Sequence, residues 1–284
     1  MVKIKYIGLL ALVLVLALVP GAAPATAVPT RIISLSPTAT EDLYAIGAGR
    51  QVIAVDNQSD YPSNAPKTKL SGYTPNAEAI AGYNPDLVVV SYDANHVVEA
   101  LGKLHIPVLV EPTATTLGQA YAQIGQLGHA TANVAGANRT VSSMKKQIAA
   151  IVKSVPRPKP ALTVYHELEP DLYSATSKTF IGRIYSLLGL KDIADAADKT
   201  GSGYPQLSDE YIVAADPKLI VLADSICCGQ TVAKVDKRPG WSTIAATKDG
   251  GVVSVSDDIA SRWGPRIVNF VRIVAAAVTR VARA

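Results

Sequence analysis

The sequence predicts an α/β protein of two lobes, each with a central parallel sheet flanked by helices, joined by one long bridging helix. Continuous Val, Ile and Leu runs alternate with helical patterns, which is typical of parallel strands buried on both faces. A stretch without strand candidates, 116–155, interrupts this alternation, and the alternation restarts after the proline-rich segment 156–160. We therefore expect an N-terminal lobe over 31–130, a bridging helix over 131–155 and a C-terminal lobe over 161–284.

The N-terminal lobe contains four short apolar runs that we expect to be strands. They are 31–36, 51–55, 87–90 and 107–110. Between the first two, Pro37 suits the first turn of a helix, which we expect to end at Gly47 or Gly49. This order of elements predicts a parallel sheet with crossover helices.

The central stretch and the C-terminal lobe follow the same logic. Apolar side chains recur at helical spacing in the bridging segment: Val141, Met144, Ile148, Ile151 and Val152. Strands are predicted at 162–165, 219–222 and 252–255, and helices at 181–188 and 265–281. The second lobe is thus expected to repeat the architecture of the first.

The first 27 residues have the pattern of a secretory signal. Lys3 and Lys5 precede an uncharged apolar run over 6–19, and a small-residue end closes with Ala25-Thr26-Ala27. The alternative is a retained membrane anchor, although the run is shorter than the roughly 20 residues that span a bilayer. No cysteine lies near the break to accept a lipid. We expect an exported protein, in a periplasm or at the extracytoplasmic face of a membrane.

The charge pattern argues against a nucleic-acid partner. Removing residues 1–27 removes two lysines and no acids, so the net charge falls from +4 to +2. The basic residues are scattered, apart from a mild cluster over 145–159 that is typical of a solvated helix face.

A repeated motif gives the sharpest functional signal. In 76–90 and again in 208–222, a capping residue is followed by Glu, then Ile, then Pro seven positions after the Glu, then a buried strand. Glu78 and Glu210 each suit the first turn of a helix, where an acid complements the helix dipole. Placed at matched corners of two lobes, the two acids suit a partner with two matched basic sockets.

The chain resembles the periplasmic solute-binding proteins of iron-siderophore and vitamin B12 ABC importers. The residues that carry the resemblance are 31–37, 59–62, the two Glu repeats and Gly264-Pro265-Arg266-Ile267. This resemblance implies a class III periplasmic-binding fold, in which one long helix bridges the lobes and the ligand lies between them. It also implies that Glu78 and Glu210 dock on arginines of an ABC permease dimer.

The ligand is expected at loops that follow the strands. The predicted ligand-binding residues are Gln58, Tyr73, Tyr92, Asp93, Tyr165, His166 and, within the loop 257–263, Ile259, Arg262 and Trp263. Twelve tyrosines against two phenylalanines suit a large amphipathic ligand. Cobalamin is favoured, with a ferric siderophore or haem as the alternative, and Arg262 would suit an anionic siderophore. We expect a monomer without a cofactor.

Other readings have less support in the sequence. A binder of manganese or zinc ions needs convergent ligands, but the four histidines are spread along the chain. An exported hydrolase lacks a nucleophile-elbow or zinc-protease motif, and Glu167 and Glu169 are interpreted as a polar rim. Cys227 and Cys228 are adjacent, and could form a vicinal disulfide, pair with another molecule or remain thiols. Their loop follows a strand and is a further candidate for ligand contact.

Overall fold

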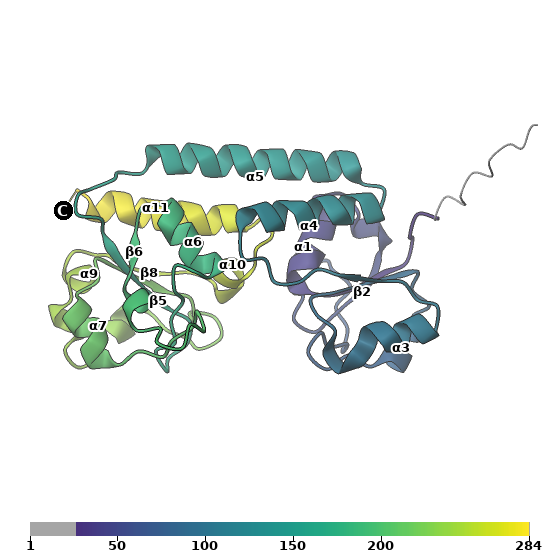
Figure 1. Ribbon diagram of the computed structural model, residues 1–284, viewed down its shortest axis with the longest axis horizontal. Coiled ribbons are helices and arrows are strands. Elements are labelled where there is room, and N and C mark those ends of the chain that lie inside the picture. Colours follow the sequence, from purple (N-terminus) through teal and green to yellow (C-terminus); the bar gives the residue numbers. More distant parts are fainter. Residues whose placement is uncertain (1–26, 284) are drawn as a thin grey trace, which may run out of the picture.

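The computed structural model describes residues 27–283, and they form two lobes under a layer of helices (Figure 1). The predicted signal segment lies outside the described residues, except for Ala27. Each lobe holds a four-stranded parallel sheet, with strand order β2-β1-β3-β4 in the N-terminal lobe and β6-β5-β7-β8 in the C-terminal lobe. The two-lobed α/β fold predicted from the apolar runs is therefore confirmed.

The N-terminal lobe follows the predicted order of elements. Its strands are β1 (Ile32–Leu35), β2 (Val52–Val55), β3 (Leu87–Val90) and β4 (Val108–Val110). Its helices are α1 (Pro37–Ala45), α2 (Ala77–Ala81), α3 (Val97–Lys103) and α4 (Leu117–Ala130). Every residue of β1 and β3 is buried, which explains why both strands are apolar apart from Ser34 in β1.

The C-terminal lobe repeats this order with two differences from the prediction. Its strands are β5 (Thr163–Glu167), β6 (Lys191–Asp192), β7 (Leu219–Leu222) and β8 (Val252–Ser254). Its helices are α6 (Phe180–Leu187), α7 (Asp209–Ala215), α8 (Val232–Val235), α9 (Ala245–Lys248), α10 (Asp257–Ser261) and α11 (Ile267–Val281). The two-residue edge strand β6 was not predicted, and α10 forms where a loop was expected.

A helical layer, made of α4, α11 and the long helix α5 (Val134–Ser154), joins the lobes. Figure 1 shows α5 lying across α4 on one side and α11 on the other. Ala137, Met144 and Ile148 form the buried stripe of α5. One apolar core runs from β1 and β3 through this layer into β5, β7 and α11, so the two lobes share a hydrophobic interior.

The two Glu motifs form equivalent helix starts. The Asn76 side chain accepts a hydrogen bond from the Ala79 amide at the start of α2, and Ser208 accepts one from the Tyr211 amide at the start of α7. In both repeats the residue before the shared proline has positive φ: Asn84, three residues after the end of α2, and Asp216, the C-cap of α7. Asn and Asp tolerate this left-handed conformation better than other non-glycine residues, which accounts for their place in the repeat.

Candidate ligand site between the lobes

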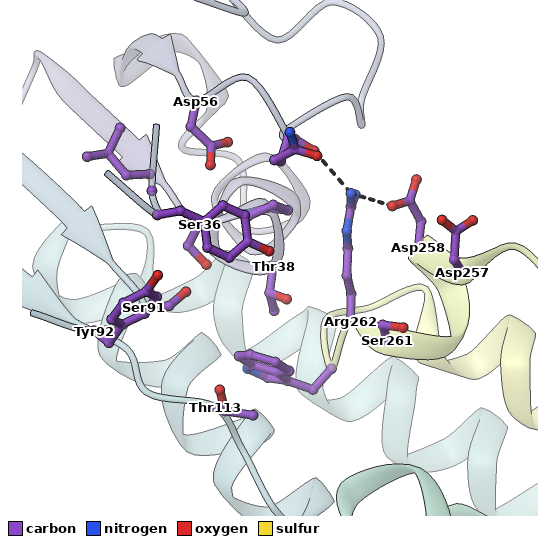
Figure 2. A pocket seen from close by; sticks show the side chains of 16 residues that line it. Ser36, Thr38, Asp56, Ser91, Tyr92, Thr113, Asp257, Asp258, Ser261 and Arg262 are labelled. Atoms are coloured by element: carbon purple, nitrogen blue, oxygen red, sulfur yellow. Dashed lines mark hydrogen bonds and ion pairs between the residues drawn. The ribbon is translucent and has the colours of Figure 1, made fainter. Parts of the chain in front are cut away.

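A cavity of about 380 Å³ lies between the lobes, where the N-terminal lobe strands end and the α10 segment approaches them (Figure 2). Its walls follow each strand in turn. The N-terminal lobe contributes Leu35, Ser36, Pro37, Thr38, Asp56, Gln58, Gly72, Tyr73, Ser91, Tyr92 and Thr113, and the C-terminal lobe contributes Asp257, Asp258, Ser261, Arg262 and Trp263. This is the edge of a parallel α/β sheet at which ligands usually bind.

Five of the nine predicted ligand residues line this cavity. They are Gln58, Tyr73, Tyr92, Arg262 and Trp263. Tyr73 leaves 70% of its surface exposed, and Tyr92 47%, so both rings are accessible to a ligand. Gly72, just before Tyr73, lets the backbone pack closely against the end of β1, because a Cβ at this position would lie 2.3 Å from the Leu35 carbonyl oxygen. The Trp263 indole N–H donates to Gln123 on α4 at 2.8 Å, which fixes the ring at the cavity wall.

Two of the remaining residues, Asp93 and Ile259, face away from the cavity lining. The Asp93 carboxylate accepts the Val98 amide at 2.9 Å near the start of α3, so it serves the local fold. Ile259 is half-buried against the common core. Each directly follows a residue that does line the site, Tyr92 and Asp258 respectively.

Tyr165 and His166 lie in the interior of the C-terminal lobe, which corrects their prediction as ligand residues. Strand β5 extends to Glu167, two residues beyond its expected end, and both side chains are fully buried. His166 Nδ1 lies 2.5 Å from the Tyr185 hydroxyl, and burial lowers the pKa of His166 to about 3. The imidazole is therefore neutral and serves as a core residue.

Arg262 lines the cavity, but its guanidinium is already paired with acidic side chains. One terminal nitrogen lies 3.1 Å from both Glu41 and Asp60, and the other contacts Asp258 at 2.5 Å and the Gln58 carbonyl at 3.1 Å. Figure 2 shows the guanidinium in contact with Asp258 of its own segment, whereas Glu41 and Asp60 belong to the N-terminal lobe. Arg262 thus joins the lobes, and it is not a free cation for an anionic siderophore.

Glu41 is the centre of this interlobe ion-pair cluster, and sequence reasoning did not identify it. Its carboxylate is 1% exposed, and it also accepts two bonds from Arg266, at 2.8 Å from Nε and 2.5 Å from Nη2. Arg266 in turn stacks 4.2 Å from the Tyr61 ring centroid. The only sequence signal was indirect, since Arg266 belongs to the Gly-Pro-Arg stretch that carried the family resemblance.

The cavity also holds other carboxylates, of which Asp56 and Asp257 form no ion pair among the described residues. Asp56 follows β2 directly, is 1% exposed, and has one oxygen without a hydrogen-bond partner among the described residues. Burial raises the pKa of Asp56, and it also raises the pKa of Asp258. Asp257 adds a third acid to the lining. The position of Asp56 directly after a predicted strand was the signal that could have identified it.

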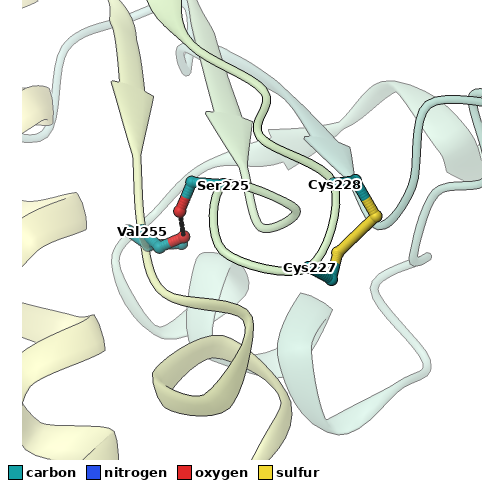
Figure 3. Close-up of a disulfide and its surroundings, with 4 residues drawn as sticks. All are labelled: Ser225, Cys227, Cys228 and Val255. Carbon is teal, nitrogen blue, oxygen red and sulfur yellow. Dashed lines mark hydrogen bonds between the residues drawn. A yellow bond between two sulfur atoms is a disulfide. The ribbon is translucent and has the colours of Figure 1, made fainter.

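The loop after β7 lies at the carboxyl edge of the C-terminal lobe sheet, the edge at which β8 leads into α10. The Ser225 hydroxyl donates to the Val255 carbonyl at 2.7 Å, two residues before α10, which ties this loop to the cavity segment (Figure 3). Cys227 and Cys228 form a vicinal disulfide, which settles the pairing left open by the sequence. Ile226 beside it is 69% exposed. The loop therefore presents apolar surface to solvent.

A buried polar cluster lies behind this loop, and it corrects the interpretation of Glu167 as a rim residue. Glu167 is fully buried and forms a bidentate pair with Arg238, at 2.5 and 2.6 Å. Asp224 is also buried, and burial together with the neighbouring Glu167 raises the pKa of Asp224 to about 7. The two loop amides of Cys228 and Gln230 donate to the Asp224 carbonyl.

The predicted docking residues do not line this cavity. Glu78 and Glu210 are both exposed, on α2 and α7, and neither forms an ion pair within residues 27–283. Figure 1 shows α7, and α3 beside α2, at the side of the molecule opposite α5. Over the same residues no cluster of three or more His, Cys, Asp or Glu side chains could hold a metal ion. No helix there is long and apolar enough to cross a bilayer.

Curated relatives share this architecture over most of their length. The chain is 32% identical to an uncharacterized ABC transporter substrate-binding lipoprotein of Bacillus subtilis, over 88% of this chain and 80% of that protein. It is 33% identical to a cobalamin-binding protein of Halobacterium salinarum, over 84% of this chain and 67% of that protein. A vitamin B12-binding protein of Pectobacterium atrosepticum is 30% identical over 86% of each.

Solved structures agree with the fold. A possible iron-binding periplasmic solute-binding protein of Staphylococcus epidermidis superposes with a TM-score of 0.75 at 26% identity, over 89% of this chain and 99% of that one. The vitamin B12 binding protein of Vibrio cholerae gives 0.74 at 22% identity, over 90% of this chain and 99% of that one, and supports the fold alone. The family model described as periplasmic binding protein matches residues 32–259. The chain belongs to the periplasmic binding protein family.

Proposed function

We propose that this protein is an exported carrier that binds cobalamin in the cavity between its lobes and delivers it to an ABC permease. The observation that carries the choice of ligand is the charge balance of the cavity. Asp56 and Asp257 line it without an ion-pair partner among the described residues, whereas Arg262, the one cation of the described lining, is already paired with Glu41, Asp60 and Asp258. Such a site disfavours anionic ligands and suits a ligand rich in hydrogen-bond donors.

A corrinoid has this chemistry. Its rim carries primary amides, which donate hydrogen bonds to carboxylate and hydroxyl oxygens such as those of Asp56, Ser36 and Thr38. Its flat macrocycle offers apolar faces to Tyr73 and Trp263. A cavity of about 380 Å³ encloses part of so large a molecule, and we assign the opposite wall to Ile226 and the vicinal disulfide. Relatives named for cobalamin or vitamin B12 support the same assignment.

Haem and ferric siderophores are the alternative ligands, and one observation favours them. The phenol oxygens of Tyr73 and Tyr92 are accessible and could ligate iron. Haem propionates and anionic siderophores need cations as well, and within the described residues the cavity lining offers Arg262 alone, with its guanidinium occupied. We therefore rank these chelates below cobalamin.

Delivery is assigned to Glu78 and Glu210. Both are exposed, both start a short helix at the same side of the molecule, and neither forms an ion pair among the described residues. Hydrogen bonds from its own amide and from Ser208 lower the pKa of Glu210, so this acid is charged at neutral pH. Two such acids fit two basic sockets on a symmetric permease dimer.

The transport role is tested in cells that depend on this carrier for cobalamin. Replacing Glu78 and Glu210 together by Ala is expected to abolish uptake, while the purified variant binds cobalamin as the unaltered protein does. Glu99→Ala with Glu169→Ala, two exposed acids outside α2 and α7, is the charge-matched control and should transport normally. Loss of ligand affinity in the first variant, or normal uptake, would refute the docking assignment.

A further inference from the structure

The acidic residues of this protein are distributed very unevenly. None of the 23 Asp and Glu residues lies in 112–166 or in 259–284. The same two stretches carry Arg139, Lys145, Lys146, Lys153, Arg157, Lys159, Arg262, Arg266, Arg272, Arg280 and Arg283. A net charge of +4 for the whole chain therefore hides a strong separation of charge.

The fold brings the two acid-free stretches together. They contain α4, α5 and α11, which are the three helices of the helical layer (Figure 1). Arg262 and Arg266 are absorbed by the ion pairs with Glu41 at the interlobe contact. The other nine cations are exposed, and none forms an ion pair with a carboxylate within residues 27–283. The layer is thus a cationic surface.

Three cations form a straight row on α5. Arg139, Lys146 and Lys153 are spaced by seven residues, so they project from nearly the same side of the helix. The buried stripe of α5 lies on the opposite side, which points the row away from the protein. At 1.5 Å per residue, the row is about 21 Å long.

A second group of cations lies beside the C-terminal half of α5. Arg272, Arg280 and Arg283 border a groove of about 560 Å³ between α11 and α5, together with the hydroxyl residues Ser154 and Thr279. The hydrogen bonds of these arginines go to neutral acceptors, Arg272 to Asn269 and Gln147 and Arg280 to the Gly250 carbonyl. Their charge is therefore not neutralised within the molecule.

We propose that the helical layer is a docking surface for a linear polyanion of the cell envelope, a polymer with regularly spaced phosphate groups. A row of cations about 21 Å long suits a chain of charges better than one small anion. Arginine pairs with phosphate in a bidentate manner, and three arginines border the groove. The proposal does not require recognition of bases or sugars, because the three cations of the row line neither the interlobe cavity nor the groove.

The orientation of this surface rests on the proposed function. When Glu78 and Glu210 face a permease in the membrane, α5 lies at the opposite side of the molecule and points away from the bilayer. A polymer outside the membrane can then hold the carrier near the permease without competing for the docking side. A bilayer bound to the same helices would turn the docking acids away from the permease.

Long-chain polyphosphate is the probe, measured by equilibrium binding to residues 27–284 between 50 and 200 mM salt. We expect binding that weakens steeply with salt, because each phosphate contact releases a counterion. The triple variant Arg139→Gln, Lys146→Gln, Lys153→Gln should bind at least tenfold more weakly. The control variant Lys69→Gln, Lys199→Gln, Lys248→Gln has the same net charge, changes exposed lysines of the lobes, and should bind within twofold of the unaltered protein.

Four results would overturn the proposal. Equal losses in both triple variants would mean attraction by net charge alone. Orthophosphate binding as tightly as the polymer would indicate a single-anion site, and tighter binding of single-stranded DNA would indicate a nucleic-acid surface. Vesicles of phosphatidylglycerol and phosphatidylcholine binding as tightly as polyphosphate would indicate a membrane surface. Cobalamin affinity, measured on the same variants and expected unchanged, separates this proposal from that of the ligand.

Discussion

Removing the charge of Glu41 should weaken the contact between the two lobes and lower the free energy of unfolding. The substitution Glu41→Gln keeps the shape of the side chain. It leaves Arg266 without an ion-pair partner among residues 27–283, whereas Arg262 keeps Asp60 and Asp258. Breaking a buried pair on one side costs about 3 to 5 kcal/mol, because a charge stays buried without compensation. Arg266 keeps 17% of its side chain exposed, so we expect the lower end, about 3 kcal/mol.

The assay is urea-induced unfolding followed by circular dichroism and by tryptophan fluorescence. In a thermal melt of a protein of this size, the same loss of about 3 kcal/mol corresponds to a fall in Tm of roughly 6 to 12 °C. Glu99→Gln is the matched control, because its pair with Lys103 is 67% and 72% exposed and should contribute less than about 1 kcal/mol. The double variant Glu41→Gln with Arg266→Met should recover part of the loss, since no charge then remains unpaired. An effect of Glu41→Gln no larger than that of Glu99→Gln would refute the reasoning.

Three further predictions test the interior and the ligand site. Burial raises the pKa of Glu111 from 4.5 to about 7, so its contribution to folding is complete below pH 4.5 and is lost as pH rises to about 7. The free energy of unfolding of Glu111→Gln relative to the unaltered protein should therefore rise between pH 5 and pH 8; a constant difference would contradict the shift. Tyr185→Phe leaves buried His166 Nδ1 without its partner and should cost about 1 to 3 kcal/mol in urea unfolding, and a neutral result would show that the bond is not needed. Ile226→Asp should weaken cobalamin binding about tenfold by removing apolar contact at the proposed wall, whereas Leu104→Asp, also exposed, should not, and equal affinities would exclude the loop.

The fold was predictable because its strands are buried on both faces. Parallel strands covered by helices read as continuous apolar runs, so β1, β3 and β7 could be recognised without any partner. β6 escaped because two residues, Lys191 and Asp192, carry no pattern. The bridging helix was visible from the spacing of its buried stripe, and α5 lies inside the predicted range.

The site was only partly predictable, for reasons of register and of distance along the chain. The rule that ligand residues follow strands found Gln58 and Tyr92, but it failed after β5, which runs two residues further than its apolar pattern suggested. This moved Tyr165 and His166 into the core. Glu41 could not be linked to Arg266, because 225 residues separate them and only the folded chain brings them together.

The central claim is most directly tested by calorimetric titration of residues 27–284 with cyanocobalamin, haemin and an anionic ferric siderophore under one set of conditions. The acidic, aromatic cavity predicts one cobalamin per chain, bound at least tenfold more tightly than either anionic chelate. Asp56→Asn, which keeps an acceptor oxygen but removes the charge, should reduce the ratio of the affinity for cobalamin to the affinity for the anionic chelates. Tighter binding of haemin or the siderophore, or no heat with cobalamin, would contradict the assignment of the ligand.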